Sequence, residues 1–295
     1  MISEQATVIA NSELSGGLRQ IVLRAPGIAT STEPGQFLHL LLSGHGDHLL
    51  RRPFSIHDVY ADKHGDFSFV SVVYQVVGSG TALLAGYSSG AVLDVLGPIG
   101  RPWQPPLGAK RALVVGGGVG FAALTLLVGS LQAWGTETQV LLGARDKTVA
   151  LSLLGGGSSG SYRSYALRDI PTPPNTGYSQ QVATDDGSYG HHGLVTELSA
   201  VALADGHFDY VATCGPEAMM RIVAAQAAAA GASGAASLER RMACGVGACL
   251  SCVVQTASGQ KRACVDGPVF DVLELADWGL AARSPGPDAA LEGER

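Results

Sequence analysis

The chain has 295 residues, 46% of them hydrophobic and 15% charged, and a formal net charge of −6. At ~150 residues per domain, this length predicts two or three domains with substantial cores. The acidic balance, without a lysine and arginine run, argues against a nucleic-acid partner, and no stretch of about 18 apolar residues predicts a membrane span. With no apolar signal segment after "MISEQATVIANSE", we expect a cytoplasmic protein.

Residues 1–103 alternate short apolar segments with turn residues. From residue 6 onward the segments are "GLRQIVLRAP", "GQFLHLLLSG", "DFSFVSVVYQVVGSGT" and "AVLDVLGPIG". Strands at this spacing, without a long helical period, predict an antiparallel β-barrel or sandwich. The stretch "TALLAGYSSG" predicts a single helix that closes it.

This first domain contains a candidate phosphate-binding site. "RRPFSI" lies between two predicted strands, and residues 78–81, "GSGT", precede the predicted helix. A helix N-terminus presents free backbone N–H groups, so Arg52 together with this helix start can hold a pyrophosphate. Phe54 offers an aromatic face and Ser55 a hydroxyl, which suit a flavin ring. The alternative is a barrel edge with a solvated Arg52.

Residues 104–238 follow a proline-rich joint, "GRPWQPPLG", and have a different pattern. "RALVVGGGVGFAALTLLVGSLQAWG" predicts an apolar strand, a glycine turn and a helix. "TQVLLGARD" and "FDYVATCGP" predict further strands, and "EAMMRIVAAQAAAAG" predicts a helix. This order predicts a parallel-sheet α/β domain, with a mobile surface loop at 155–161.

Two turns of this domain form a candidate nucleotide site. The glycine turn follows a strand and opens a helix, and "CGP" stands at the C-terminal end of a later strand, where open α/β sheets bind ligands. The turns could face one crevice, although tight helix–strand packing would also explain the glycines. Arg145 could meet a 2′-phosphate and Asp146 a ribose hydroxyl. The candidate residues are Gly116, Gly117, Gly118, Gly120, Cys214, Gly215 and Pro216.

Residues 239–280 hold four of the five cysteines, and residues 281–295 predict a disordered tail. The C-x4-C-x2-C run with a later fourth cysteine is the plant-type ligand spacing of a [2Fe–2S] cluster. Structural zinc usually uses two C-x2-C knuckles, and disulfide frameworks are typical of small secreted domains, so both alternatives fit less well. The predicted cluster ligands are Cys244, Cys249, Cys252 and Cys264. A predicted hairpin, "VVQTASGQKRA", separates Cys252 from Cys264.

These motifs resemble the ferredoxin–NADP reductase superfamily over about residues 6–235. R-x-[YF]-S for FAD appears as "RPFS", G-x-G-T for its phosphates as "GSGT", and C-G-P near the nicotinamide as "CGP". With the cluster segment included, nearly the whole chain is similar to electron-transfer subunits of class B dihydroorotate dehydrogenases. The resemblance implies a flavin barrel, an α/β nucleotide domain and a small cluster domain, with FAD, a [2Fe–2S] cluster and NAD as cofactors.

The resemblance also implies roles for single residues. Arg52 would contact the FAD pyrophosphate, Phe54 would lie by the ring, and Ser55 would bond the flavin edge. Ser55 and Cys214 would be the catalytic residues. The other flavin-binding residues that it implies are Pro53, Val73, Tyr74, Gln75, Gly80 and Thr81.

An electron-transfer function in pyrimidine (UMP) biosynthesis follows from this resemblance. A nicotinamide gives up a hydride and a cluster accepts single electrons, so FAD would stand between them. This chain shows no residue set for deprotonating a small carbon acid, so an FMN-containing catalytic subunit would oxidise dihydroorotate, in a heterotetramer of two of each subunit. A reductase subunit serving another acceptor, such as a hydrogenase or a ferredoxin-dependent enzyme, and a non-catalytic iron–sulfur redox sensor remain alternatives.

Overall fold

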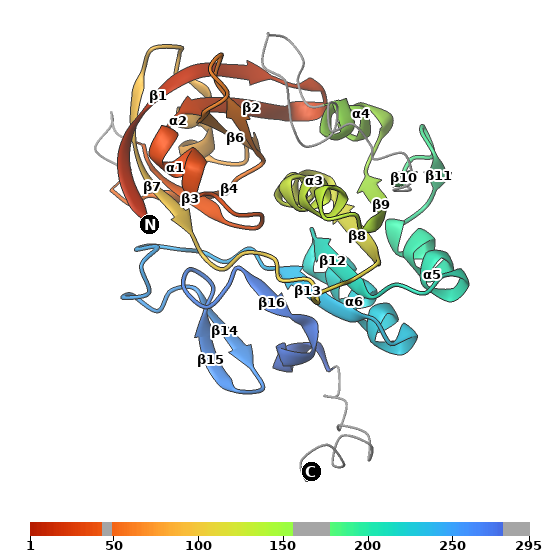
Figure 1. Ribbon diagram of the computed structural model, residues 1–295. Coiled ribbons are helices and arrows are strands. Elements are labelled where there is room, and N and C mark those ends of the chain that lie inside the picture. Colours follow the sequence, from red (N-terminus) through yellow and green to blue (C-terminus); the bar gives the residue numbers. More distant parts are fainter. Residues whose placement is uncertain (43–48, 156–177, 280–295) are drawn as a thin grey trace.

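The structure, a computed structural model, describes residues 1–42, 49–155 and 178–279. Its first sheet contains seven antiparallel strands in the order β4–β3–β7–β1–β2–β6–β5 (Figure 1). This sheet confirms the predicted antiparallel barrel. The predicted helix is present as α2 (Ser79–Ala85), which begins within "GSGT" and ends before "GYSSG", and a second helix, α1 (Pro26–Ser31), was not predicted. The strands are β1 (Ile2–Glu13), β2 (Leu18–Arg24), β3 (Phe37–Leu41), β4 (Arg52–Ser55), β5 (Asp58–Ala61), β6 (Phe67–Gln75) and β7 (Val92–Ile99).

Strand β1 begins earlier than the sequence pattern predicts. Its first residues are alternately half-buried and exposed, and they pair with β7, with Ile2 opposite Gly97 and Gln5 opposite Asp94. This half of the strand therefore depends on hydrogen bonds to a distant segment, because its own side chains carry no strong apolar alternation.

The second sheet is parallel except at one edge, and its order is β11–β10–β9–β8–β12–β13–β16. The predicted parallel α/β sheet is confirmed, and β10, β11 and β13 add strands that the sequence pattern did not predict. The strands are β8 (Arg111–Gly117), β9 (Glu137–Ala144), β10 (Tyr178–Thr184), β11 (His191–His192), β12 (Tyr210–Cys214), β13 (Ser233–Ser237) and β16 (Val269–Asp271).

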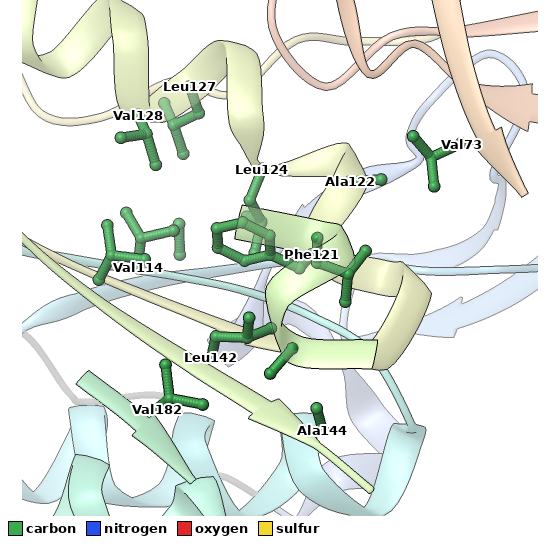
Figure 2. Packing of buried hydrophobic residues seen from close by; sticks show 14 of the residues in the cluster. Val73, Val114, Phe121, Ala122, Leu124, Leu127, Val128, Leu142, Ala144 and Val182 are labelled. Carbon is green, nitrogen blue, oxygen red and sulfur yellow. The ribbon is translucent and has the colours of Figure 1, made fainter. Parts of the chain in front are cut away.

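Helices cover both faces of this sheet. A 3-10 helix, η2 (Gly118–Ala123), leads into α3 (Thr125–Ala133), and with α4 (Lys147–Gly155) they lie on the face toward the barrel. Helices α5 (Val195–Asp205) and α6 (Glu217–Ala230) lie on the other face. Figure 2 shows Phe121 of η2 packed among side chains of this core. Because Leu18 and Val73 of the barrel belong to the same cluster, the two domains share a core.

The cluster segment is attached to both larger domains. Strands β14 (Val253–Thr256) and β15 (Gly259–Arg262) form the predicted hairpin, and β16 adds an antiparallel edge to the α/β sheet. The Arg101 N–H donates to the Gly267 carbonyl oxygen at 2.6 Å, which connects the chain just after β7 to this segment. Short 3-10 helices follow, η3 (Val272–Glu274) and η4 (Ala276–Trp278). The boundaries predicted after residues 103, 238 and 280 remain predictions.

Two sequence predictions concern segments that the structure does not describe. Helix α4 ends at Gly155, and the rest of the predicted mobile loop lies outside the described residues, as does the predicted tail at 281–295. No helix in the described part of the chain is both long and apolar enough to cross a bilayer.

The shared core should be sensitive to loss of Phe121, whose side chain is fully buried. We expect Phe121→Ala to lower the free energy of unfolding of the α/β domain by about 3–5 kcal/mol, because it removes apolar contacts and leaves a cavity. Urea unfolding followed by circular dichroism measures this change. Leu107→Ala, at a fully exposed leucine, is the matched control, and an equal loss in both variants would contradict the packing analysis.

Candidate functional site

Two neighbouring arginines before and in β4 are held in different ways. The Arg51 Nη2 forms an ion pair with Asp94 Oδ1 at 3.0 Å, and its Nη1 donates to the Asp94 carbonyl oxygen at 3.0 Å. Arg52 donates to the carbonyl oxygen of Leu50 at 3.1 Å and has no carboxylate partner among the described residues. Arg51 therefore anchors the segment to β7, whereas the Arg52 charge remains for an anion.

The structure brings "RPFS" and "GSGT" into contact. A Cβ atom at Gly80 would lie 3.2 Å from Arg52 Nε, so a larger residue would compete with the arginine for space. The Thr81 hydroxyl accepts the N–H of Val77 at 2.9 Å and that of Gly78 at 3.1 Å. This hydroxyl caps helix α2, so the contribution of Thr81 to a phosphate site would come from its backbone.

The predicted ring-contact residues divide between two sides of the barrel wall. Phe54 and Tyr74 pack edge to face, with ring centroids 5.9 Å apart. Tyr74 lies in the barrel core, where burial raises the pKa of its hydroxyl, and Val73 points into the core shared with the α/β domain. The side chains of Tyr74 and Val73 are thus engaged in packing, and at these two positions the backbone is left to face a cofactor. The side chains of Ser55 and Gln75 are exposed.

Apolar side chains stand exposed on the same two segments. Val77, which precedes "GSGT", is 79% exposed, and Leu50, two residues before Arg52, is 51% exposed. A cofactor with a phosphate group and a large aromatic ring would pair with the arginine and cover these side chains. The residues present therefore fit FAD.

The two turns of the candidate nucleotide site touch each other. A Cβ atom at Gly120 would lie 2.7 Å from Gly215 Cα, and one at Gly117 would lie 2.6 Å from Met219 Sδ. Similarly, a Cβ atom at Gly116 would meet the Phe121 side chain. Close packing accounts for these three glycines of the first turn. Gly118 differs, because its positive φ of 53° favours glycine and its missing side chain faces open space, so a ligand can approach the backbone there.

Cys214 and Pro216 flank Gly215 at the end of β12, beside this turn. Burial raises the pKa of the half-buried Cys214 thiol to about 12, so the thiol is protonated at neutral pH. A neutral thiol therefore stands beside the turn, and the role of Cys214 in catalysis remains a prediction.

Arg145 and Asp146 follow β9 and bind each other. Arg145 Nε lies 2.8 Å from Asp146 Oδ2, and Asp146 Oδ1 accepts the N–H of Val149 at 2.9 Å. The hydrogen bond from Val149, followed by that from Arg145, lowers the pKa of Asp146. Because they directly follow β9, both residues lie at the carboxyl ends of the parallel strands, where the ribose of a nucleotide would bind.

The four predicted ligand cysteines lie in one segment as two pairs. Cys252 Sγ and Cys264 Sγ are 3.4 Å apart, and Cys244 Sγ accepts the N–H of Cys249 at 3.4 Å. Within the described residues, no three His, Cys, Asp or Glu side chains surround a position for a single metal ion. Thiols in two pairs fit a two-iron cluster, in which each iron takes two protein ligands.

The loop conformation requires small residues near these thiols. Gly245 and Gly247 have positive φ angles of 69° and 80°, and a Cβ atom at Gly247 would lie 2.7 Å from Val265 Cγ2. A side chain at either position would be strained. The glycines of "CGVGAC" therefore serve the tight wrap of the loop.

The cysteines differ in their readiness to bind iron. Hydrogen bonds from Ser251, and then from Cys244, lower the pKa of the exposed Cys249 to about 6, so Cys249 is mainly a thiolate at neutral pH. Burial, and then the neighbouring Cys252, raises the pKa of Cys264 to about 12. Because metal ligands must lose their protons, cluster binding at Cys264 is coupled to proton release.

Sequence reasoning missed His39, which lies between the two sites. Its side chain is fully buried on β3, and a Cβ atom at Gly245 of the cluster loop would collide with its ring. Burial, then the charges of Arg51 and Arg52, lower the pKa of His39 to about 4. The alternation in "GQFLHLLLSG" carries a signal for it, because a histidine there lies on the face opposite Leu38.

Flavin retention should depend on Arg52. We expect Arg52→Ala to weaken FAD binding by roughly 1.5–3 kcal/mol, because it removes a charge-assisted hydrogen bond to phosphate. Fluorescence titration of the apoprotein with FAD measures the affinity. Arg24→Ala, at an exposed arginine of the same barrel, is the control, and unchanged FAD affinity in Arg52→Ala would restore the alternative of a barrel edge.

Cluster binding should depend on Cys249 and not on Cys214. We expect Cys249→Ser to lose the cluster and keep FAD that NADH can reduce, whereas Cys214→Ser should keep about two irons per chain and slow hydride transfer. Iron and sulfide analysis with stopped-flow absorbance measures both properties. Full iron content in Cys249→Ser would refute the ligand assignment.

Comparisons with known proteins agree with this geometry. Residues 239–276 match the family model described as the iron–sulfur cluster binding domain of dihydroorotate dehydrogenase B. A solved structure described as an NADH-dependent reduced ferredoxin-NADP oxidoreductase, studied for flavin-based electron bifurcation, is 26% identical with a TM-score of 0.73. The match covers 92% of this chain and 90% of that one.

Two curated relatives carry the name dihydroorotate dehydrogenase B (NAD(+)), electron transfer subunit. The protein from Desulforamulus reducens is 39% identical over 83% of this chain and 87% of its own length. The protein from Bacillus velezensis is 37% identical over 92% of this chain and 97% of its own length. The predicted resemblance, the reductase-like fold, the electron-transfer function and the cofactor set of FAD, [2Fe–2S] and NAD are confirmed. The chain belongs to the family of electron transfer subunits of dihydroorotate dehydrogenase B.

Proposed function

We propose that this chain passes electrons between NAD(H) and an FMN-containing catalytic subunit that oxidises dihydroorotate, as a cytoplasmic heterotetramer of two of each subunit. FAD and a [2Fe–2S] cluster would connect the two ends. Bound flavin supplies the chemistry that exchanges a hydride with nicotinamide and single electrons with a cluster.

The observation that carries the proposal is that the flavin motif and the cluster loop both adjoin strand β3. Phe37 of β3 and Ile99 of β7 belong to the same buried core as Cys252 and Cys264. Strand β3 pairs on its other edge with β4, which carries "RPFS". One strand therefore separates the flavin motif from the thiols, an arrangement that supports electron transfer between the two sites.

Each part of the chain has a defined task in this function. Arg52 binds phosphate while Arg51 holds the segment in place through Asp94. The exposed Ser55 hydroxyl is available for a hydrogen bond to the edge of the ring. The neutral Cys214 thiol and the open backbone at Gly118 line the approach for the nicotinamide nucleotide.

The cluster loop is buried at one end and exposed at the other. Cys252 and Cys264 are buried, whereas Cys249 is exposed, together with Val246 and Leu250, which are 44% and 62% exposed. Apolar side chains around an exposed ligand favour a protein partner at this end, because docking would bury them and shorten the path for electrons. The catalytic subunit should therefore cover Leu250.

Co-expression with the catalytic subunit tests the whole proposal. The purified assembly should contain equal amounts of both subunits, with FAD, FMN, iron and sulfide, and should reduce orotate with NADH under anaerobic conditions. A complex without FMN, or one that passes no electrons from NADH to orotate, would overturn the proposal. Light scattering coupled to size-exclusion chromatography measures the stoichiometry.

A charged residue at Leu250 should uncouple the two subunits. We expect Leu250→Asp to lower NADH-linked orotate reduction at least tenfold, with iron content and NADH-to-dye activity retained. Aspartate tolerates the positive φ of 58° at this position, so the loop should keep its fold. Turnover with the catalytic subunit, assayed beside dye reduction, separates docking from cluster loss.

Leu194→Asp is the matched control for this variant. Leu194 is 55% exposed and is the N-cap residue of α5, a helix that lies far from the β14–β15 hairpin in Figure 1. Aspartate also suits its position as a helix N-cap. Equal loss of coupled turnover in both variants, or no loss in Leu250→Asp, would place the docking surface elsewhere.

A further inference from the structure

His39 is a buried polar side chain without a hydrogen-bond partner. It is fully buried, and neither Nδ1 nor Nε2 has a partner among the described residues. An unpaired buried polar group destabilises the folded state, so a native protein normally supplies it with a partner. The other buried histidine of the barrel, His57, has one, with Nδ1 3.1 Å from Ser71 Oγ.

The position of His39 indicates what the missing partner is. Its side chain points away from the barrel core, on the face of β3 from which Phe37 reaches the core around Cys252 and Cys264. The site of a Cβ atom at Gly245 is occupied by the ring, with Nδ1 as the nearest atom. Gly245 directly follows Cys244, so the imidazole lies against the backbone beside a predicted iron ligand.

We propose that His39 donates a ring N–H hydrogen bond to a sulfur atom of the bound cluster or of its thiolate ligands. The inference rests on the [2Fe–2S] cluster of the proposed function and assigns a positioning residue to it. A neutral imidazole has one N–H donor, and the sulfurs of a cluster held by Cys244 would supply acceptors beside the Gly245 backbone that the ring contacts. Hydrogen bonds to these sulfurs are one of the factors that set the reduction potential of such clusters.

His39 would also join the two redox sites mechanically. Its carbonyl oxygen accepts a hydrogen bond from Arg51 Nη1 at 3.4 Å, and it stands opposite Pro53 of "RPFS" in the ladder between β3 and β4. The same residue thus contacts the flavin-binding strand through its backbone and the cluster loop through its ring.

Nitrogen hyperfine spectroscopy tests the hydrogen bond directly in the unmodified protein. The chain is prepared with 15N in its histidines only, the cluster is reduced with dithionite, and HYSCORE spectra are recorded. A weak 15N coupling is expected, and it should disappear in His39→Gln. Absence of any 15N coupling in a sample with a full cluster signal would overturn the proposal. The ring nitrogens would then be bonded to an ordered water or to nothing.

Substitutions then measure the effect on the potential. Loss of the donor destabilises the more negative, reduced cluster, so His39→Leu should make its one-electron reduction at least tenfold less favourable, which is a shift of at least ~59 mV to lower potential. His39→Gln retains an N–H donor and should recover part of this shift. EPR-monitored redox titration measures each midpoint.

The matched control is His57→Leu, which removes a buried imidazole from the same barrel. We expect the cluster potential and EPR spectrum of His57→Leu to equal those of the parent protein. Equal shifts in the two variants, or an unchanged potential in His39→Leu, would refute the role of His39. Iron and sulfide content distinguishes this outcome from failure of the proposed function, because a chain without a cluster would contain neither.

Discussion

Strand β3 is buried on both faces, and the positions of the redox sites depend on this constraint. Leu38 and Leu40 fill the barrel core, while Phe37 enters the core around the buried cysteines. A strand in an antiparallel barrel usually exposes one face to water, so a second buried face requires another domain to cover it. Here the C-terminal segment provides the cover, and the cluster loop is held against the strand that pairs with the flavin motif.

Shared buried residues also join the barrel to the α/β domain. Leu18 and Val73 extend from the outer wall of the barrel into the core formed by η2, α3 and the second sheet. Strand β16 then returns from the cluster segment to pair with β13. Each domain contributes residues to the core of a neighbouring domain. Loss of one interface would therefore disturb the alignment of the flavin, nucleotide and cluster sites.

The glycine turn contacts the "CGP" turn directly, and its glycines illustrate why a glycine-rich sequence does not reveal the role of each glycine. In a chain with 40 glycines, a glycine run could reflect bias, packing or ligand binding. Gly117 and Gly120 are fixed by contacts with Met219 and Gly215, whereas Gly118 faces open space. The sequence pattern alone could not separate these roles, since close packing, an open approach for a ligand and the positive φ of 53° at Gly118 all favour glycine.

Local patterns predicted those features whose physics is local. Alternation in segments such as "DFSFVSVVYQVV" predicted β6. The cysteine spacing predicted the ligand set, because three thiols in one short loop and a fourth after a hairpin match the plant-type pattern. The strands β10 and β13 escaped prediction, since their apolar residues are few and their hydrogen bonds come from distant strands.

By itself, the sequence determined the classes of sheet and the family to which the chain belongs, and it predicted the domain boundaries and the thiol ligands. Only the tertiary structure decided that Arg52 meets Gly80, that Arg51 is tied to Asp94, and that Tyr74 and Val73 face protein cores. It also placed His39 beside the cluster loop. The physical reason is that a side chain's role depends on which distant segment covers it, and burial across domains leaves no periodic trace in the local sequence.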